Sequence, residues 1–358
     1  MRSRQARTWA FAQARRVRES LSRRPIVHKF RRRGADGLNL AAGGCILIRQ
    51  LGNRDMQTLR QIRSLLSQVG LSPRQRFGQC FMIDLNLMGK LLELADVGRA
   101  ATVLEVGPGT GSLTEELLLR AGKVVAVEID RGLSQLLRDG FKGRDKLMLL
   151  CCDALSGKHR LAEEVVGALG PSAELVSNLP FNIATPLLAE CLAGSWRALH
   201  GRGGCRFDRM TFTVQREVAD RLAARPGSGD YGPVSMLAAL LGRVRLGSIV
   251  PASAFWPRPK VASRMVRIDF DPTSARRVRD VERLSGLLAV AFSQRRKQIG
   301  SIVRRKQGHF EPEALDAALG AAGVDRSLRP QDVEPEKYLC MANSLAASSG
   351  AMKVKREV

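Results

Sequence analysis

The chain is poor in the residues that bind metal ions or form disulfide frameworks. Only four histidines occur among its 358 residues, and they lie far apart. The seven cysteines are odd in number, scattered mostly within apolar runs, and lack the paired spacing of a zinc site. We therefore expect no metal centre, and reduced thiols as in a cytosolic-type compartment.

Long apolar stretches are also missing. No run approaches the ~18 residues that a membrane-spanning helix needs. The N-terminus lacks the apolar segment of a secretory signal. We expect a cytoplasmic protein without a membrane span, and a monomer.

Acidic residues are scarce relative to basic ones. The chain contains 58 Lys and Arg against 34 Asp and Glu, which gives a formal net charge of +24 and a pI near 10.9. Solubility alone requires far less charge than this. The excess predicts a polyanionic partner, and nucleic acid is the partner that we expect.

Residues 1–55 differ from the rest of the chain because they are rich in arginine and contain few acids. Three interpretations stay open. The stretch is a disordered basic tail, a mitochondrial transit peptide, or a segment foreign to the native protein, with Met56 as the true start. A helix is expected directly afterwards, from Gln57 to Val69.

Helical and strand patterns alternate between about residues 85 and 215. Helices are expected at 87–95 and from about Ser112, the second one after a glycine-rich turn. The alternation predicts an α/β domain over residues 56–272 with a doubly wound, mostly parallel sheet. The expected strands are 102–106, 124–129, 147–152, 175–177 and 210–214, and the later strands 244–250 and 265–270 are expected to pair antiparallel at the sheet edge.

The pattern becomes entirely helical after Pro272. We interpret residues 273–347 as a small all-helical C-terminal domain, followed by a tail at 348–358. The expected helices are 281–292, 294–305, 312–321 and 335–346.

Three expected strands end in residues that suit an adenosine-containing ligand. Gly107 and Gly109 follow the first strand, Glu128 ends the second, and Asp153 closes the third. Glycines let the backbone approach a ligand closely, and a carboxylate after the second strand accepts ribose hydroxyls. Because parallel strands share one carboxyl edge, we expect these residues to meet there.

These residues do not by themselves identify the ligand, since nicotinamide and flavin proteins use similar glycine turns and a similar acid. The spacing here, however, is G-x-G-x-G instead of G-x-G-x-x-G. Pro108 also removes a backbone donor that a pyrophosphate would use. Asp153 has an alternative interpretation as the N-cap of the next helix.

The tetrapeptide Asn178-Leu179-Pro180-Phe181 follows a further buried strand and favours methyl transfer over hydride transfer. The Asn178 side-chain oxygen and the Pro180 carbonyl can accept the two hydrogens of an exocyclic amine. Phe181 can stack on the ring that bears this amine. Since an adenine amine is a poor nucleophile, such a site would act by positioning and electrostatics, without a dedicated base.

With these motifs, the chain resembles the rRNA adenine N6,N6-dimethyltransferase family, which includes the bacterial small-subunit rRNA dimethylase and its eukaryotic and mitochondrial relatives. The resemblance implies a Rossmann-like class I methyltransferase fold with S-adenosylmethionine as cofactor. It also implies N6,N6-dimethylation of two adjacent adenines near the 3′ end of small-subunit rRNA, within an immature 30S-type subunit. The resemblance runs from about Gly70 to Ala346, and besides Glu128 and Asp153 it rests on Arg76–Phe81, Gly107–Gly111, Asn178–Phe181, Tyr231-Gly232, Pro251–Phe255, Pro259–Val261 and Phe292–Lys297.

The resemblance assigns Gln79, Cys80 and Met82 to a segment that closes over the methionine end of the cofactor. The family usually has Asn where this chain has Cys80, and Leu where it has Met82. Phe181 stands where many bacterial members have Tyr, so stacking is kept and a hydroxyl is lost. Phe255 would face the other side of the target adenine, and its alternative is an ordinary core aromatic.

The resemblance also implies that Arg295, Arg296 and Lys297, on an expected helix, contact RNA phosphates. A solvated helix face is the alternative. A large-subunit rRNA adenine methylase of the antibiotic-resistance type shares the fold and tetrapeptide, but the helical C-terminal end favours the small-subunit branch. The intact cofactor edge opposes a purely non-catalytic role, as an assembly checkpoint or a mitochondrial transcription factor of this family.

Overall fold

The computed structural model describes residues 57–74, 77–157, 159–304 and 310–354, with side chains up to residue 346. The interpretations of residues 1–55 lie outside this range, as do the last residues of the expected tail. None of the described helices is long and apolar enough to cross a membrane.

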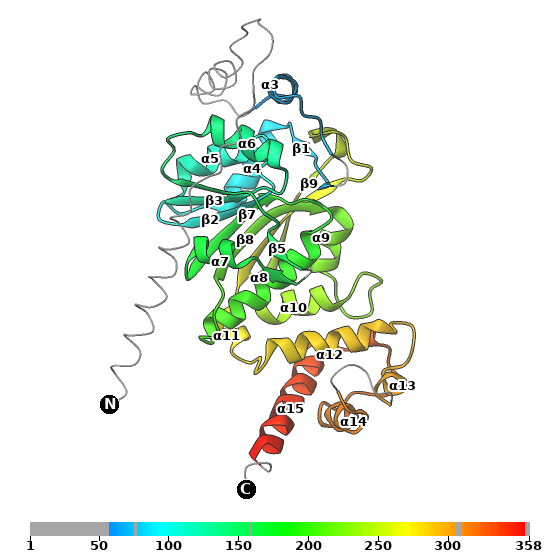
Figure 1. Cartoon of the computed structure of the whole chain (residues 1–358). Coiled ribbons are helices and arrows are strands. Elements are labelled where there is room, and N and C mark those ends of the chain that lie inside the picture. The colour runs from blue at the N-terminus through cyan, green and yellow to red at the C-terminus, as the bar shows by residue number, and fades with distance from the viewer. Residues whose placement is uncertain (1–56, 75–76, 158, 305–309, 355–358) are drawn as a thin grey trace, which may run out of the picture. The chain divides into compact units, whose positions relative to one another are not determined.

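A central sheet of seven strands has the order β4-β3-β2-β7-β8-β11-β9 (Figure 1). Neighbouring strands from β4 to β8 are parallel, and β11 is antiparallel to both β8 and β9. The predicted parallel sheet with an antiparallel edge is therefore confirmed. The strands are β2 (Thr102–Val106), β3 (Lys123–Val127), β4 (Leu147–Leu150), β7 (Ser172–Asn178), β8 (Arg206–Gln215), β9 (Gly242–Val250) and β11 (Ser263–Phe270).

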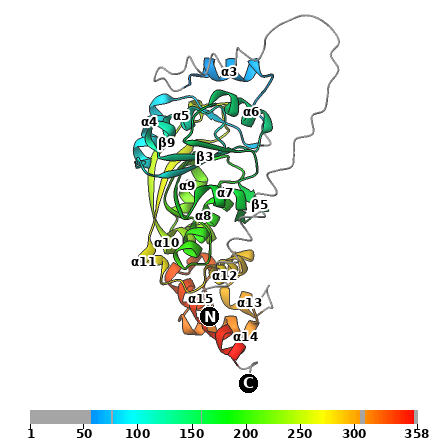
Figure 2. The same cartoon turned by 60° about the vertical axis from the view of Figure 1, so that its left-hand side comes forward.

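Helices cover both faces of this sheet (Figures 1 and 2). Since successive strand residues point to opposite sides, each strand packs against both layers of helices. Val103 packs into the apolar cluster that includes α4, α5 and α6, and its neighbour Leu104 packs into the cluster that includes α7, α8 and α10. One set is α4 (Leu85–Ala95), α5 (Ser112–Arg120) and α6 (Arg131–Gly140), and the other is α7 (Glu163–Leu169), α8 (Ala184–Leu199), α9 (Arg216–Leu222) and α10 (Pro233–Leu241).

Smaller elements complete the α/β region. Helix α3 (Leu59–Gln68) begins with a capping box between Thr58 and Gln61. Strand β1 (Phe81–Met82) pairs antiparallel with β10 (Phe255–Trp256). A short hairpin of β5 (Leu155–Ser156) and β6 (Arg160–Leu161) follows β4.

The chain after Pro272 is helical, as predicted, and shares one apolar core cluster with α8 and α10. The indole of Trp196, on α8, donates to the Val278 carbonyl at 2.8 Å and ties the two regions together. The helices are α11 (Pro272–Ala275), α12 (Val281–Ser293), α13 (Ile299–Val303), α14 (Pro312–Ala321) and α15 (Pro335–Val354).

The expected helix at 294–305 is wrong in its first half. Gln294 ends α12 with φ −131° and ψ 50°, and the chain turns until α13 begins at Ile299. The Arg295 guanidinium donates to Gln331 at 2.9 Å and to the Gly229 carbonyl, so it is held by groups distant in sequence. Such tertiary contacts override local helical propensity.

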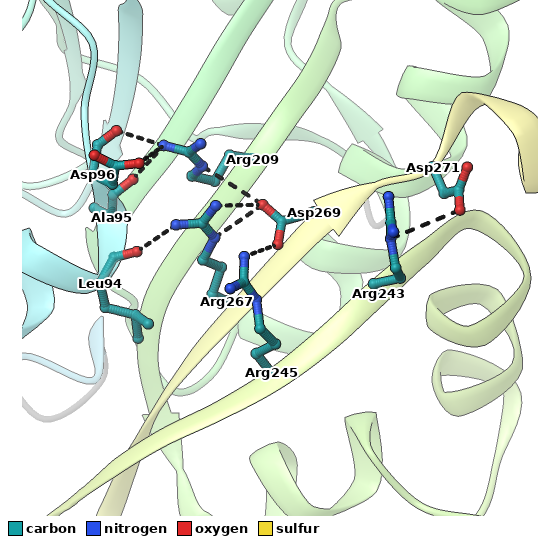
Figure 3. Close-up of polar contacts among 9 residues, drawn as sticks. All are labelled: Leu94, Ala95, Asp96, Arg209, Arg243, Arg245, Arg267, Asp269 and Asp271. Carbon is teal, nitrogen blue, oxygen red and sulfur yellow. Dashed lines mark hydrogen bonds and ion pairs between the residues drawn. The ribbon is translucent and has the colours of Figure 1, made fainter.

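Arginines on the sheet hold the C-terminal end of α4 (Figure 3). Arg267 donates to the Leu94 carbonyl at 2.9 Å, and Arg209 donates to the Ala95 carbonyl at 2.8 Å. Carbonyls in the last turn of a helix have no partner within it, and the helix dipole favours positive charge there. Asp269 accepts from Arg267 at 2.9 Å and balances these charges. The network ties α4 to strands β8 and β11.

We expect Asp269→Asn to lower the free energy of unfolding at neutral pH by about 1 kcal/mol, because charge-assisted hydrogen bonds to its carboxylate are weakened. Burial alone would raise the pKa of Asp269, but hydrogen bonds from Arg267 and Arg245 outweigh it, and the pKa is lowered. This stabilisation is therefore present above the ordinary carboxyl pKa of about 4, and it is lost as the pH falls through the folded-state pKa.

Urea unfolding of both proteins between neutral and acid pH measures this difference, which should shrink below about pH 4. Asp208→Asn is the control, because that carboxylate is half exposed and pairs with Arg206 on the surface. It should change the free energy of unfolding by only ~0.5 kcal/mol. An Asp269→Asn effect that does not vary with pH contradicts the account.

Candidate active site

A cavity of about 1070 Å³, including its open mouth, lies at the carboxyl edge of the parallel strands. Open α/β sheets bind ligands at this edge. The cavity brings together every predicted cofactor residue and the whole tetrapeptide. The predicted residues that line it are Gln79, Cys80, Met82, Gly107, Gly109, Glu128, Asp153, Asn178, Pro180 and Phe181.

The turn between β2 and α5 requires glycine at two of the predicted positions. Gly107 and Gly109 have φ values of 72° and 62°, in the left-handed region. A Cβ at Gly107 would lie 2.8 Å from the Pro180 ring, and one at Gly109 would lie 2.7 Å from the Phe81 ring. The turn is thus packed directly against the tetrapeptide on one side and against β1 on the other.

Glu128 follows β3 and holds the turn by hydrogen bonds. Its carboxylate is 4% exposed and accepts from the Gly109 amide at 3.3 Å and from the Asp130 amide at 2.9 Å. Burial raises the pKa of Glu128 to about 7 and outweighs these hydrogen bonds. Asp130 caps α6 by accepting from the Gly132 amide at 2.9 Å.

A second buried acid, Glu105, lies at the end of β2 and lines the same cavity. The Thr114 hydroxyl donates to its carboxylate at 2.7 Å. Burial raises the pKa of Glu105 to about 8, with a smaller contribution from the charge of Glu128. Sequence analysis gives this acid no role, because alternation along a buried strand does not show that it contacts a cavity.

Asp153 lies in the loop after β4, is exposed, and borders the cavity. Its carboxylate accepts from the Leu155 amide at 3.0 Å. The alternative interpretation of Asp153 as a helix N-cap is wrong, because the β5–β6 hairpin intervenes and α7 begins only at Glu163.

Asn178 is the last residue of β7, and both ends of its side-chain amide are hydrogen bonded. Its Nδ2 donates to the Cys80 carbonyl at 2.8 Å. Its Oδ1 accepts from the hydroxyl of Thr213 on β8. The Pro180 carbonyl accepts from the Ile183 amide at 3.2 Å, which leaves that oxygen one further lone pair. Phe181 is half buried at the cavity wall.

The segment around β1 closes the opposite wall. Gln79 accepts from the Arg74 amide at 2.8 Å, and its buried Nε2 has no partner among the described residues. Cys80 is half buried, and burial raises the pKa of its thiol. Met82 is 4% exposed and lies opposite Phe255 in the β1–β10 pairing.

Phe255 and the basic run are not brought to this cavity. Phe255 is 2% exposed within the apolar core that includes α4, and it does not line the cavity. Its predicted contact with the target base stays a prediction. Arg295, Arg296 and Lys297 lie in the turn between α12 and α13, where Arg296 and Lys297 are exposed.

Helix α3 contributes a wall that sequence analysis does not assign to the site. Ile62 lines the cavity, and Gln57 donates to the Thr110 carbonyl of the glycine turn at 2.9 Å. The guanidinium carbon of Arg63 lies 5.2 Å from the centroid of the Trp256 ring, over its face. An amphipathic pattern predicts the helix and its buried face, but it does not say what that face covers.

No cluster of three or more potential metal ligands occurs in the part of the chain that the structure describes. Besides its apolar lining, the cavity is bordered by polar groups that include carboxylates, amides, hydroxyls and glycine backbone. Such groups suit a ligand rich in hydroxyl and amine hydrogens.

Comparison with known proteins gives a consistent match. The family model described as ribosomal RNA adenine dimethylase matches residues 70–347. The chain is 37% identical over 293 residues to the ribosomal RNA small subunit methyltransferase A of Phenylobacterium zucineum, covering 82% of this chain and 95% of the relative. It is 35% identical over 292 residues to the protein of the same name from Moorella thermoacetica, covering 79% of this chain and 96% of the relative.

Solved structures agree on the fold. A dimethyladenosine transferase from Plasmodium falciparum gives a TM-score of 0.56 at 22% identity, over 72% of this chain and 94% of that chain. The 23S rRNA methyltransferase ErmE gives a TM-score of 0.50 at 24% identity, over 74% of this chain and 99% of that chain. These similarities confirm the predicted class I methyltransferase fold.

We expect the stability of Glu128→Gln relative to the wild type to rise by on the order of 2 kcal/mol between about pH 5 and pH 8 in the ligand-free protein. Glutamine replaces only one of the two accepting oxygens, and this loss of a hydrogen bond is the same at every pH. The folded-state pKa of Glu128, about 7, lies above the unfolded value of about 4.3. Between these values the unfolded chain releases a proton that the folded chain keeps, so the wild type loses stability as the pH rises. Glutamine cannot ionise and removes this loss.

Thermal and urea unfolding between about pH 5 and pH 8 should show the gap between variant and wild type widening with pH. Glu163→Gln, at an exposed position on α7, is the matched control and should give no such trend. A gap that stays constant between pH 5 and pH 8 would show that the carboxylate is not held in an unfavourable ionised form.

Proposed function

Because the chain belongs to the ribosomal RNA adenine dimethylase family, we propose that it dimethylates N6 of two adjacent adenines in small-subunit rRNA. The proposed methyl donor is S-adenosylmethionine, and the proposed substrate is an immature small subunit with its 3′-terminal hairpin. The observation that carries the proposal is that the Asn178 amide shares one cavity with the glycine turn and Glu128.

The residues at the cavity fit S-adenosylmethionine, which supplies an electrophilic methyl group when bound. Glu128 offers its carboxylate to the ribose hydroxyls, and Asp153 offers an acceptor to the adenine amine. Gly107 and Gly109 line the cavity without side chains, so their backbone would lie close to the cofactor. The buried Gln79 Nε2 and Ser112 Oγ have no partners among the described residues and are suited to the methionine end.

The tetrapeptide would present the target amine. The Asn178 oxygen and the Pro180 carbonyl each keep one lone pair that could accept a hydrogen of that amine. Phe181, which lines the same cavity, would stack on the base. The amine nitrogen would form the new bond to the methyl carbon as the bond from carbon to sulfur breaks. The proton that the nitrogen loses would pass to water, so rate acceleration rests on positioning and electrostatics.

The C-terminal helical region, residues 273–347, is proposed as an RNA platform. Arg296 and Lys297 are exposed and would contact RNA phosphates. Arg295 also forms a hydrogen bond within the protein, to Gln331. The proposed enzyme acts as a monomer where small subunits assemble, in the cytoplasm. A mitochondrial site follows instead if residues 1–55 are a transit peptide.

Transfer of radiolabelled methyl groups tests the function. The wild type should label immature small subunits and leave large-subunit RNA unlabelled. Asn178→Ala should lower turnover roughly 100-fold or more, because the acceptor oxygen offered to the reacting amine is lost. RNA binding should stay within a few fold. Labelling of large-subunit RNA instead, or wild-type turnover by Asn178→Ala, would overturn the proposal.

Cys80→Asn should tighten S-adenosylmethionine binding about fivefold, since an added side-chain amide supplies a hydrogen bond of about 1 kcal/mol. Titration calorimetry measures the change. Cys340→Asn is the control, because this cysteine is exposed on α15 and does not line the cavity, and the Kd of this variant should stay within about twofold of the wild type. An unchanged or weaker affinity of Cys80→Asn would show that the cofactor does not meet this side chain.

A further inference from the structure

Thr213 lies beside the catalytic tetrapeptide without belonging to it. It is the residue of β8 that pairs with Asn178 of β7 in the parallel register. Its side chain is fully buried, and its hydroxyl donates to Asn178 Oδ1. The Leu179 amide also donates to the Thr213 carbonyl at 3.2 Å, so the tetrapeptide continues the strand pairing. Thr213 does not line the cavity.

The hydroxyl of Thr213 helps to fix which end of the Asn178 amide is the acceptor. An asparagine side chain has a broad, roughly two-fold torsion at its amide, and its two ends exchange donor and acceptor when it flips. Here the Cys80 carbonyl holds Nδ2 at 2.8 Å, and Thr213 holds Oδ1. With both ends held, Oδ1 keeps one lone pair, and it is an acceptor that the site offers to an incoming amine.

We propose that Thr213 is a positioning residue for methyl transfer, which acts by holding the Asn178 amide with its oxygen available to the target amine. The inference rests on the proposed function. Without the hydroxyl, only the Cys80 carbonyl orients the amide, and a rotated amide presents N–H groups to an amine that itself donates.

The second methylation should depend on Thr213 more than the first. After one transfer the amine keeps a single hydrogen, so fewer hydrogen bonds fix its direction. A loosely held Asn178 therefore slows the second transfer more than the first. Loss of Thr213 should make monomethyladenine accumulate.

The chain contains a matched control on the same strand. Thr211 lies two positions earlier, on the same face of β8, and is also fully buried. Its hydroxyl has no hydrogen-bond partner among the described residues. A Thr→Val change at position 211 removes the same atoms from a similar environment without touching Asn178.

The test compares Thr213→Val, Thr213→Ser and Thr211→Val with the wild type on immature small subunits. We expect Thr213→Val to lower kcat at least about tenfold, with KM for S-adenosylmethionine and for the subunit within about twofold. Thr213→Ser keeps the hydroxyl and should retain turnover within about threefold. Thr211→Val should match the wild type.

Product analysis by mass spectrometry adds a readout that a purely structural role would not move. At equal total methylation, Thr213→Val should yield a larger share of monomethyladenine than Thr211→Val. A general loss of folded enzyme lowers both products without changing this share. Calorimetric binding of S-adenosylhomocysteine with a Kd within about twofold of wild type verifies that the site is intact.

Equal kcat and equal product shares for Thr213→Val and Thr211→Val, with an active wild type, would overturn the role of Thr213 alone. If Thr213→Val does not fold, the pair Thr213→Ala and Thr211→Ala carries the same comparison and the same outcomes. If the wild type methylates no rRNA, the proposed function fails, and the role of Thr213 fails with it.

Discussion

Two hydrogen bonds to the Asn178 amide are the interactions on which the site depends. One joins β7 to the backbone of Cys80, in a segment that lines the cavity, and the other joins β7 to Thr213 on β8. The same strand end packs closely on the glycine turn, since a Cβ on Gly107 would lie only 2.8 Å from the Pro180 ring. A single amide therefore connects the side of the cavity proposed for the methyl donor to the side proposed for the target base.

The molecule places its unfavourable and its stabilising charges at different parts of the sheet. At the cavity, burial raises the pKa of Glu105 and of Glu128, so ionised carboxylates there cost folding stability. Elsewhere on the sheet, Arg209 and Arg267 neutralise the C-terminal end of α4 with Asp269 between them. Sites that bind ligands commonly carry such unfavourable groups, because a ligand supplies the missing partners.

Sequence alone predicts the sheet, its antiparallel edge and the strand-end residues of the cavity, because periodicity and strand ends are local signals. Gln79, Cys80 and Met82 are expected there only from the family resemblance. It does not predict that the run from Gln294 to Lys297 is a turn, since that depends on the bond from Arg295 to Gln331. Nor does it identify Thr213 or Ile62. Their positions depend on the register between two strands and on what a buried helix face covers, and the local sequence pattern determines neither.

The central claim is that the tetrapeptide cavity methylates adenine N6 in small-subunit rRNA. The most direct measurement maps methyl groups on immature small subunits after incubation with the protein and deuterium-labelled S-adenosylmethionine, by nuclease digestion and mass spectrometry. The account predicts N6,N6-dimethyladenosine carrying the label at two adjacent positions in the 3′-terminal hairpin. Label on another atom of the base, at scattered positions, or absent altogether would contradict it.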